Sequence, residues 1–213
     1  MLSSAEPRGD VVNAVDRGLL DQLSTLEMDC TRSLEEYDYA RALQNTESFF
    51  WSLCDDYLEL VKARRYGDHG AEGAGSANTT LLHTLSVVTR LFAPFLPFVA
   101  EEVWSWWQPG SVHSAPWPTG LETTQLLGSD GRGAGLLTLA SAREVLAEVR
   151  RQKSLQKRPL KALVASAVLT ADAAYVARLS SVEADLKAAA NVREFRYVEG
   201  NGPMVELNFE TEL

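Results

Sequence analysis

Two consecutive stripes of apolar residues constrain the fold of this chain more than any other feature of its sequence. Within 12–34 and again within 39–60, apolar side chains recur every three or four positions. This spacing places each set on one face of an α-helix. We therefore predict helices over about 10–36 and 38–65, each about 40 Å long at 1.5 Å per residue. Two helices of this length should pack antiparallel in a bundle.

Proline and glycine divide the following stretch into shorter segments. The glycine-rich segment 67–80 is typical of a flexible surface loop. Apolar spacing then predicts a third helix, which Pro94 and Pro97 should break or kink because proline cannot continue the helical hydrogen-bond ladder. We predict a fourth helix that 101–107 completes and whose start is favoured by Pro97 and by Glu101 and Glu102 in an early turn. An extended, proline-punctuated segment over 111–120 should follow it.

A second unit is predicted after the glycine-rich segment 128–135, which is typical of a boundary. Helical spacing resumes there, and short β-prone runs follow it. The predicted elements are a helix over 136–157, a strand over 160–169, a helix over 172–190, and a hairpin of 193–198 with 204–210 around Asn201 and Gly202.

These segments together predict a mainly α fold, a helical bundle followed by a small α+β C-terminal unit. The length of 213 residues allows one domain plus a smaller one. We place the bundle domain at 1–120, a linker at 121–135 and the α+β domain at 136–213.

Composition excludes several classes of protein. The most lipid-like run, 91–100, has about half the length that a membrane span needs, and the N-terminus lacks the pattern of a signal peptide. Cys30 and Cys54 would lie on the order of 15 Å apart in the predicted helix pair, too far for a disulfide. We expect two core thiols and a location in the reducing cytoplasm.

The residues needed for most catalytic sites are missing. Neither the three histidines nor the two cysteines have zinc-site spacing, no serine lies in a GxSxG motif, and no phosphate-binding glycine loop is present. We therefore predict no catalytic residue, metal or cofactor in this chain. His83 is expected to be a surface residue or a satisfied core residue. The large rings of Trp51, Trp104, Trp106 and Trp107 should pack within the bundle, and Trp117 should plug it rather than stack on a base.

One stretch reverses the acidic character of the chain. The net charge of −9 argues against nucleic-acid binding over the whole surface. Residues 143–161 nevertheless contain seven basic and two acidic side chains, a local charge of +5. A solvated helix face with extended lysines would explain this charge equally well.

Four motifs in order then match a known family. They are EEYDYARALQNTESFFWSLCDDYLELVKARRYG at 35–67, RLFAPFLPFVAEEVWSWW at 90–107, SVHSAPWP at 111–118 and EVRRQKSLQKRPLK at 148–161. Together they resemble the C-terminal part of class I aminoacyl-tRNA synthetases of the valyl type. The DYARAL-like pattern in the first motif and the PFLPF-EE-W pattern in the second are shared with the isoleucyl and leucyl types, whereas FFW…CDDYLELVK and SVHSAPWP favour the valyl type. The resemblance covers about 10–165 and is weak over the terminal hairpin.

The resemblance implies a helical anticodon-binding domain that recognises valine-accepting tRNA. The HIGH and KMSKS signatures of adenylation are absent, so we expect this chain to be inactive alone. We expect Met1 to be the start of an expressed fragment or a local start, and not that of the full enzyme. ATP and Mg²⁺ are implied for the full-length enzyme only. We expect a monomer that binds neither DNA nor membrane.

Basic residues would contact the tRNA backbone because each can neutralise a phosphate, while a polar or aromatic face would contact unpaired anticodon bases. The candidates are Lys62, Arg64, Arg65, Arg150, Arg151, Lys153, Lys157 and Arg158. Two alternatives remain open. One is an isoleucyl or leucyl relative, and the other is a non-catalytic helical module that binds a protein.

Overall fold

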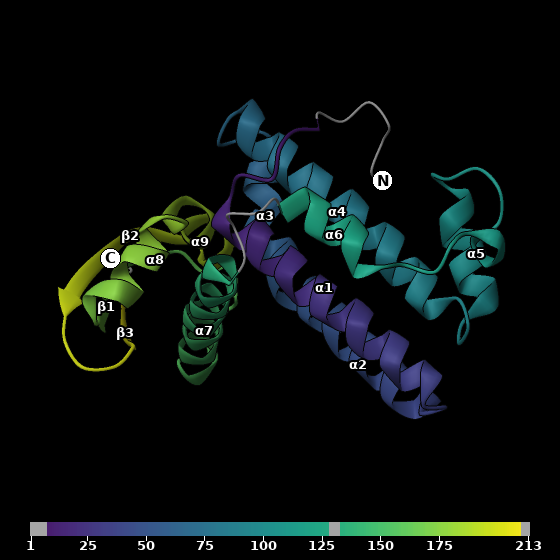
Figure 1. Ribbon diagram of the computed structural model, residues 1–213. Helices are drawn as coiled ribbons and strands as arrows, with labels where there is room; N and C mark the ends of the chain where they lie inside the picture. Colours follow the sequence, from purple (N-terminus) through teal and green to yellow (C-terminus); the bar gives the residue numbers. More distant parts are fainter. Residues whose placement is uncertain (1–7, 128–132, 210–213) are drawn as a thin grey trace.

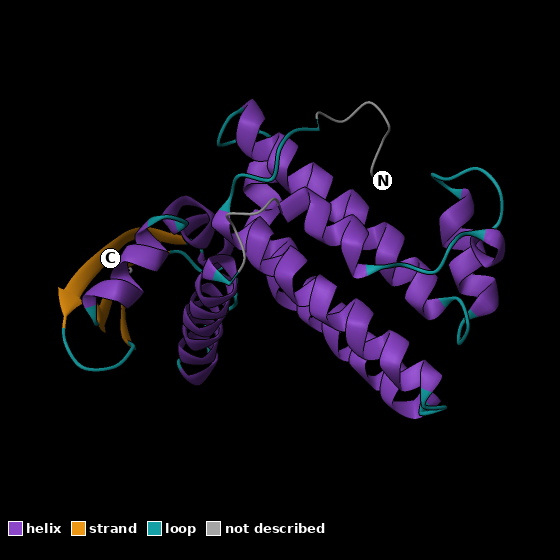
Figure 2. Cartoon of the chain, in the orientation of Figure 1, coloured by secondary structure: helices purple, strands orange, loops and turns teal. Residues whose placement is uncertain are grey.

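The computed structural model describes residues 8–127 and 133–209 (Figure 1). Helices dominate the chain, and a small sheet lies toward its C-terminal end (Figure 2). This architecture confirms the predicted fold class. The elements are α1 (Ala14–Glu35), α2 (Tyr39–Ser52), the π-helix η1 (Leu53–Tyr57), α3 (Leu58–Arg65), α4 (Ala71–Phe92), α5 (Pro97–Ser105), the 3₁₀ turn η2 (Val112–Ser114), α6 (Gly120–Leu127), α7 (Ala134–Leu155), β1 (Val164–Ala171), α8 (Ala173–Ser180), α9 (Glu183–Ala190), β2 (Val192–Glu199) and β3 (Met204–Asn208).

The first predicted helix is confirmed as α1, which runs antiparallel to α2 (Figure 1). The Asn13 side chain caps α1 by accepting a hydrogen bond from the Val15 amide. Leu19 and Leu23 are fully buried on its inner face. The apolar stripe therefore faces the core, as its spacing indicates.

The second predicted helix, over 38–65, is confirmed as unbroken helical backbone from Tyr39 to Arg65, although one turn of it is not α-helical. It is formed by α2, η1 and α3, and the single π turn of η1 lies between the two α-helices. A π turn holds one extra residue and so rotates the following side chains relative to an α-helix. Tyr57, at the end of η1, is fully buried, and its hydroxyl donates to Asp16 Oδ1 at 2.7 Å. Local spacing could not predict this rotation.

The predicted loop over 67–80 is wrong beyond its first residues, because α4 begins at Ala71. Its glycines permit close packing rather than flexibility. A Cβ added to Gly75 would lie 3.0 Å from the Gly9 nitrogen, so the chain before α1 can run directly against α4 only if this position has no side chain.

The fourth helix, α5, starts at Pro97 as its sequence indicates and ends at Ser105, two residues before its predicted end. Proline suits the first turn of a helix because that turn needs no amide donor. Of the four helical tryptophans, Trp104 is buried and stacks edge-on with half-buried Trp107. Trp51 and Trp106 are exposed, so the prediction that they pack in the bundle is wrong. Trp117 packs against the core, and its Nε1 donates to Thr31.

A helix occupies the first part of the predicted linker. In this helix, α6, Leu127 is buried against the core that α1 and α4 share, while 128–132 lie outside the described residues. A second core also crosses the predicted boundary, because Leu19 of α1 belongs to the same cluster as Leu146 of α7 and Leu169 of β1. The division into two domains stays a prediction.

The strand order is β2-β1-β3, with β2 parallel and β3 antiparallel to β1. The predicted hairpin is therefore wrong, because β2 and β3 flank β1 and do not pair with each other. β1, predicted over 160–169, lies over Val164–Ala171 and supplies the most buried side chains of the sheet. β1 lies between the other two strands, so both of its edges are paired, and this position agrees with the high burial of its side chains.

The predicted helix over 172–190 is also divided. It forms α8 and α9, with a break at Ser181 and Val182. The two helices connect β1 to β2, as a parallel pair requires. The predicted helix over 136–157 agrees with α7 to within two residues at each end.

Candidate nucleic-acid interface

α3 ends in a basic segment whose three cations lie in different environments. Lys62 is exposed, and its Nζ lies 3.4 Å from Glu59 Oε1 on the preceding turn. Arg65 is half-buried, and its Nε donates to Asn78 Oδ1 on α4 at 3.2 Å. Cations at this position also interact favourably with the negative end of the helix dipole. Lys62 and Arg65 therefore remain candidates for contact with an anion.

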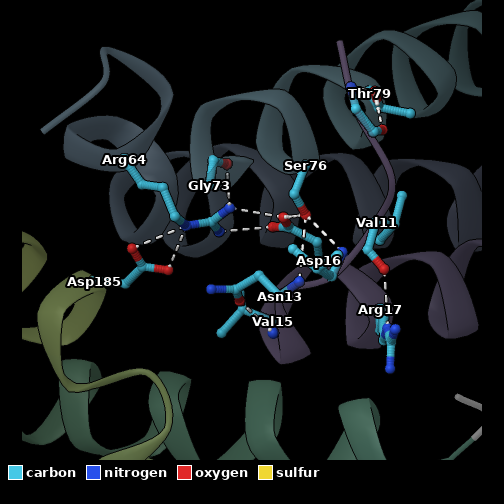
Figure 3. A network of polar contacts seen from close by, with 12 residues as sticks. Val11, Asn13, Val15, Asp16, Arg17, Arg64, Gly73, Ser76, Thr79 and Asp185 are labelled. Atoms are coloured by element: carbon cyan, nitrogen blue, oxygen red, sulfur yellow. Dashed lines mark hydrogen bonds and ion pairs between the residues drawn. The ribbon is translucent and has the colours of Figure 1, made fainter. Parts of the chain in front are cut away.

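Arg64 instead lies in a buried polar network (Figure 3). Only 3% of its surface is exposed. Its Nη1 and Nη2 donate to both carboxylate oxygens of Asp16 on α1 at 2.7 and 2.8 Å, and its Nε donates to Asp185 on α9 at 2.9 Å. Nη1 also donates to the Gly73 carbonyl oxygen. This set satisfies the guanidinium within the protein.

The network also settles the protonation of Arg64. Burial alone would lower the pKa of this guanidinium, but hydrogen bonds and charge from Asp16, with the charge of Asp185, raise its pKa above the ordinary value. The side chain is permanently charged and inaccessible to a phosphate. We therefore assign Arg64 to the joining of α1, α3 and α9 and remove it from the candidate interface.

The two arginines near the end of α7 are held by acidic partners. Arg150 Nη1 donates to Asp56 Oδ1 at 3.1 Å, and its Nη2 donates to the Asp55 carbonyl oxygen at 2.8 Å. Arg151 is exposed and forms a two-pronged pair with Glu148, one turn earlier, at 2.7 Å. These hydrogen bonds lower the pKa of Glu148 to about 2. Both arginines are accessible, but part of their charge is already neutralised.

Lys153 is enclosed by backbone. With 1% of its surface exposed, it donates from Nζ to the carbonyl oxygens of Leu160, Ala162 and Ala190 at 2.7–2.8 Å. Burial lowers the pKa of its ammonium group. All three ammonium hydrogens are used, so Lys153 fastens the loop after α7 to the end of α9. We remove it, like Arg64, from the candidate interface.

The cations after α7 differ from the arginines within it in having no acidic partner among the described residues. Lys157 and Lys161 are exposed, and Arg158 is half-buried with its guanidinium 4.5 Å from the centroid of the Phe209 ring. Among the described residues, none of these three side chains has an acidic partner. Lys157 has the left-handed φ of 54°, which turns the chain away from α7. We name Lys157, Arg158 and Lys161 the α7 loop patch.

A surface groove of about 690 Å³ is lined by residues of both α3 and α7, the two helices that carry the basic regions. Arg150 and Lys161 line it together with Asp55 and Glu59. Lys62 lies one turn beyond Glu59 on α3. The groove therefore has mixed charge, with basic side chains beside it, and the structure does not gather the predicted cations into one continuous site.

One residue of this region was missed at the sequence level. Tyr66, which ends α3, is 72% exposed and lies beside Arg65, whose guanidinium is 5.1 Å from the ring centroid. The available signal was an aromatic residue directly after a basic run at a helix end. We call Lys62, Arg65 and Tyr66 the α3 terminal patch.

Two other expectations concern single residues. His83 is half-buried and hydrogen-bonded to Thr123 Oγ1 at 2.7 Å, which confirms it as a satisfied residue. Cys30 is buried and Cys54 is half-buried, and both are free thiols. Within 8–127 and 133–209, no His, Cys, Asp and Glu residues form a group suited to a metal, and no helix there is long and apolar enough to cross a membrane.

Comparison with known proteins gives one family match. Residues 16–165 match the family described as the anticodon-binding domain of tRNA ligase. The range begins at the buried Asp16 and ends in β1, so it includes both basic patches.

Curated relatives give a consistent set of names. The chain is 44% identical to the valine–tRNA ligase of Salinispora tropica, with 91% of this chain and 24% of that ligase covered. It is 50% identical to that of Thermobifida fusca, with 85% and 20% covered, and 41% identical to that of Cutibacterium acnes, with 96% and 22% covered. The chain thus spans less than a quarter of the length of these relatives.

Proposed function

Because this chain belongs to the family of anticodon-binding domains of tRNA ligases, we propose that it supplies the tRNA-recognition part of a valine–tRNA ligase. The observation that carries this proposal is the family match over 16–165, together with identities of 41–50% to valine–tRNA ligases. The four sequence motifs support the same assignment independently of the fold. Valine ligation, with its ATP and Mg²⁺, is assigned to regions of the relatives that this chain does not match.

The accessible cations suggest how the tRNA is held. Lys62 and Arg65 of the α3 terminal patch and the α7 loop patch can each face a backbone phosphate, and Arg151 can exchange Glu148 for one. Such contacts fix position and orientation on the nucleic acid but do not read its sequence. Correct docking of the anticodon arm would then orient the acceptor end toward a catalytic region elsewhere in the ligase.

The experiment that tests this function is direct binding. The 213-residue chain is titrated with valine tRNA, with the same tRNA carrying substituted anticodon bases, and with isoleucine tRNA, over a series of salt concentrations. Tighter, salt-sensitive binding of valine tRNA supports the proposal. Equal binding of all three reduces the role of the chain to phosphate contact, and preference for isoleucine tRNA points to the isoleucyl type.

A second candidate function, contact with a protein surface, is favoured by one exposed apolar segment. Leu96, Phe98 and Val99 at the start of α5 are exposed, Phe98 to 88%, and 91–100 contains no charged residue. Consecutive exposed apolar residues are unusual on a surface that faces only water. Self-association of the wild-type chain in sedimentation velocity that Phe98→Ser abolishes would support this second function and overturn the monomer proposed next.

We further propose that the protein acts as a monomer in the cytoplasm. The buried free thiol of Cys30 and the lack of a disulfide between the two cysteines support a reducing compartment. Sedimentation of the wild-type chain at micromolar concentration tests the monomer, and fractionation of cells that express the complete protein tests the location.

A further inference from the structure

Six aromatic side chains are prominent on the described surface, and they differ in what surrounds them. They are Tyr37, Tyr39, Trp51, Tyr66, Phe98 and Trp106. An exposed ring among cations has the chemistry of a site that stacks an unpaired base, because stacking uses the ring face and the cation attracts the neighbouring phosphate. We therefore compared the six by their charged and aromatic contacts.

Five of the six lack a cation against the ring in the part of the chain that the structure describes. Tyr37 and Tyr39 contact each other edge-on at 6.4 Å and flank Asp38. Trp51 stacks edge-on against Phe50, and Trp106 Nε1 donates to Glu102. Phe98 lies in the uncharged run at the start of α5. These surroundings do not favour a polyanion.

Tyr66 is the exception. The Arg65 guanidinium lies 5.1 Å from the centroid of its ring, and Arg65 is itself held by Asn78 on α4. The cation therefore has an anchored position on the ring rather than a freely moving one. Lys62, one turn earlier on α3, places a second exposed cation near the same helix end.

The chain after Tyr66 leaves open space for a ligand. Residues 66–70 are all exposed. Gly67 and Gly70 have φ of +96° and +88°, and a Cβ added at either would meet no atom within 4 Å. These turns need glycine for their conformation, and the two glycines themselves place no side chain beside the aromatic ring. Asp68 and His69 between them are also exposed, and Arg65 lies over one face of the ring, so a base would stack on the other face.

We propose that Tyr66 is a stacking site for an unpaired base of the bound RNA, with Arg65 holding the ring and Lys62 contacting a flanking phosphate. This inference rests on the proposed function and deepens it, because it assigns base contact to one side chain of the α3 terminal patch. An unpaired base is required, since a base within a duplex has both faces covered by its neighbours.

The test uses the whole 213-residue chain and two RNA probes, a hairpin with the anticodon loop of valine tRNA and a fully paired duplex of equal length. Tyr66→Ala should weaken hairpin binding about 5- to 150-fold, the range for loss of one stacked base. It should leave duplex binding and the salt dependence of hairpin binding unchanged, because the ring carries no charge. Tyr66→Phe, which keeps the ring face, should bind like the wild type.

Two control variants separate stacking from general effects. Tyr39→Ala removes another exposed ring, 54% exposed, and should not change hairpin binding. Lys62→Ala should reduce the slope of log affinity against log salt by about 0.7 to 0.9, the value for one phosphate contact. Circular dichroism of each variant verifies folding, which the exposure of these side chains should preserve.

The outcomes distinguish this inference from the function on which it rests. If the wild-type chain binds neither RNA, the proposed function and the stacking site both fail. If the wild type binds the hairpin and Tyr66→Ala binds equally well, the stacking site alone is overturned. Equal weakening of hairpin and duplex binding by Tyr66→Ala would also overturn it, because duplex bases are not available for stacking.

Discussion

Gly18 of α1 lies directly against Gly135 of α7, so that a Cβ added to Gly18 would be 2.3 Å from the Gly135 carbonyl oxygen. Two helices can approach this closely only where neither has a side chain at the crossing point. The contact joins the bundle to the helix that carries the basic stretch. It therefore sets the position of the α7 loop patch relative to α3.

This contact predicts a large effect for a single methyl group. In Gly135→Ala the new Cβ would lie 2.5 Å from the Gly18 nitrogen, and backbone cannot move aside as a flexible side chain can. We expect the free energy of unfolding to fall by about 1–3 kcal/mol, measured by urea denaturation. Gly120→Ala is the matched control, because its Cβ would meet only side-chain atoms at ordinary contact distances, the nearest being Ser24 Oγ at 3.4 Å. Equal stability of the two variants would contradict the prediction.

The Arg64 network predicts a second stability effect. Arg64→Met would leave the carboxylates of Asp16 and Asp185 buried without their cation. Breaking a buried ion pair in this way costs about 3–5 kcal/mol of unfolding free energy. Lys62→Met, on the exposed side of the same helix, should change it by less than about 0.5 kcal/mol. A loss below about 1 kcal/mol for Arg64→Met would show that the network contributes little to stability.

Buried Glu27 predicts a pH dependence of stability. Burial raises the pKa of this carboxyl group from 4.5 to about 7, although the Thr123 hydroxyl donates to it at 3.0 Å and lowers the pKa in part. Between these two pH values the folded state binds the proton more tightly than the unfolded state does. The contribution of Glu27 to the free energy of unfolding is therefore fully present below about pH 4.5. It declines by about 2–3 kcal/mol as the pH rises to about 7.

Removal of the titrating group tests this prediction. Glu27→Gln keeps an oxygen that can accept from Thr123 but has no proton to lose. Urea denaturation at pH 5 and pH 8 should show a smaller difference for Glu27→Gln than for the wild type. Glu36→Gln, at the exposed end of α1, is the control and should keep the wild-type difference. A wild-type difference that persists in Glu27→Gln must come from other groups.

Two lysines of the basic stretch should separate stability from RNA binding. Lys153→Met leaves three carbonyl oxygens without their donor and should lower the free energy of unfolding by about 1–3 kcal/mol. Lys157→Met, at the exposed position four residues later, should leave stability unchanged and reduce the salt dependence of tRNA binding. The opposite pattern would place Lys153, and not Lys157, in the interface.

Much of the fold could be predicted because its signals are local. The apolar spacing that defines α1 and α7 depends on residues three and four positions apart, and both helices were located to within a few residues. The family resemblance likewise depended on contiguous motifs, such as SVHSAPWP. The type and order of these two elements were therefore accessible without any tertiary information.

The candidate site was predicted only in part, because a basic residue can serve either a surface or a core. Arg64 and Arg65 are adjacent and identical in type, yet only Arg64 is enclosed, by Asp185, which lies 121 residues away in the chain. Lys153 and Lys157 differ in the same way. Their spacing along the chain offers no signal that distinguishes the two roles.

The sequence by itself determined the long helices α1 and α7, the charge of each segment and the family, since each depends on residues close together in the chain. The tertiary structure alone decided the order of the strands, the π turn before α3 and the burial of Arg64 and Lys153. These features depend on which distant groups complete a hydrogen bond or fill a core. An ionised side chain remains in water unless the fold provides partners that replace its hydration, and those partners come together only when the whole chain has folded.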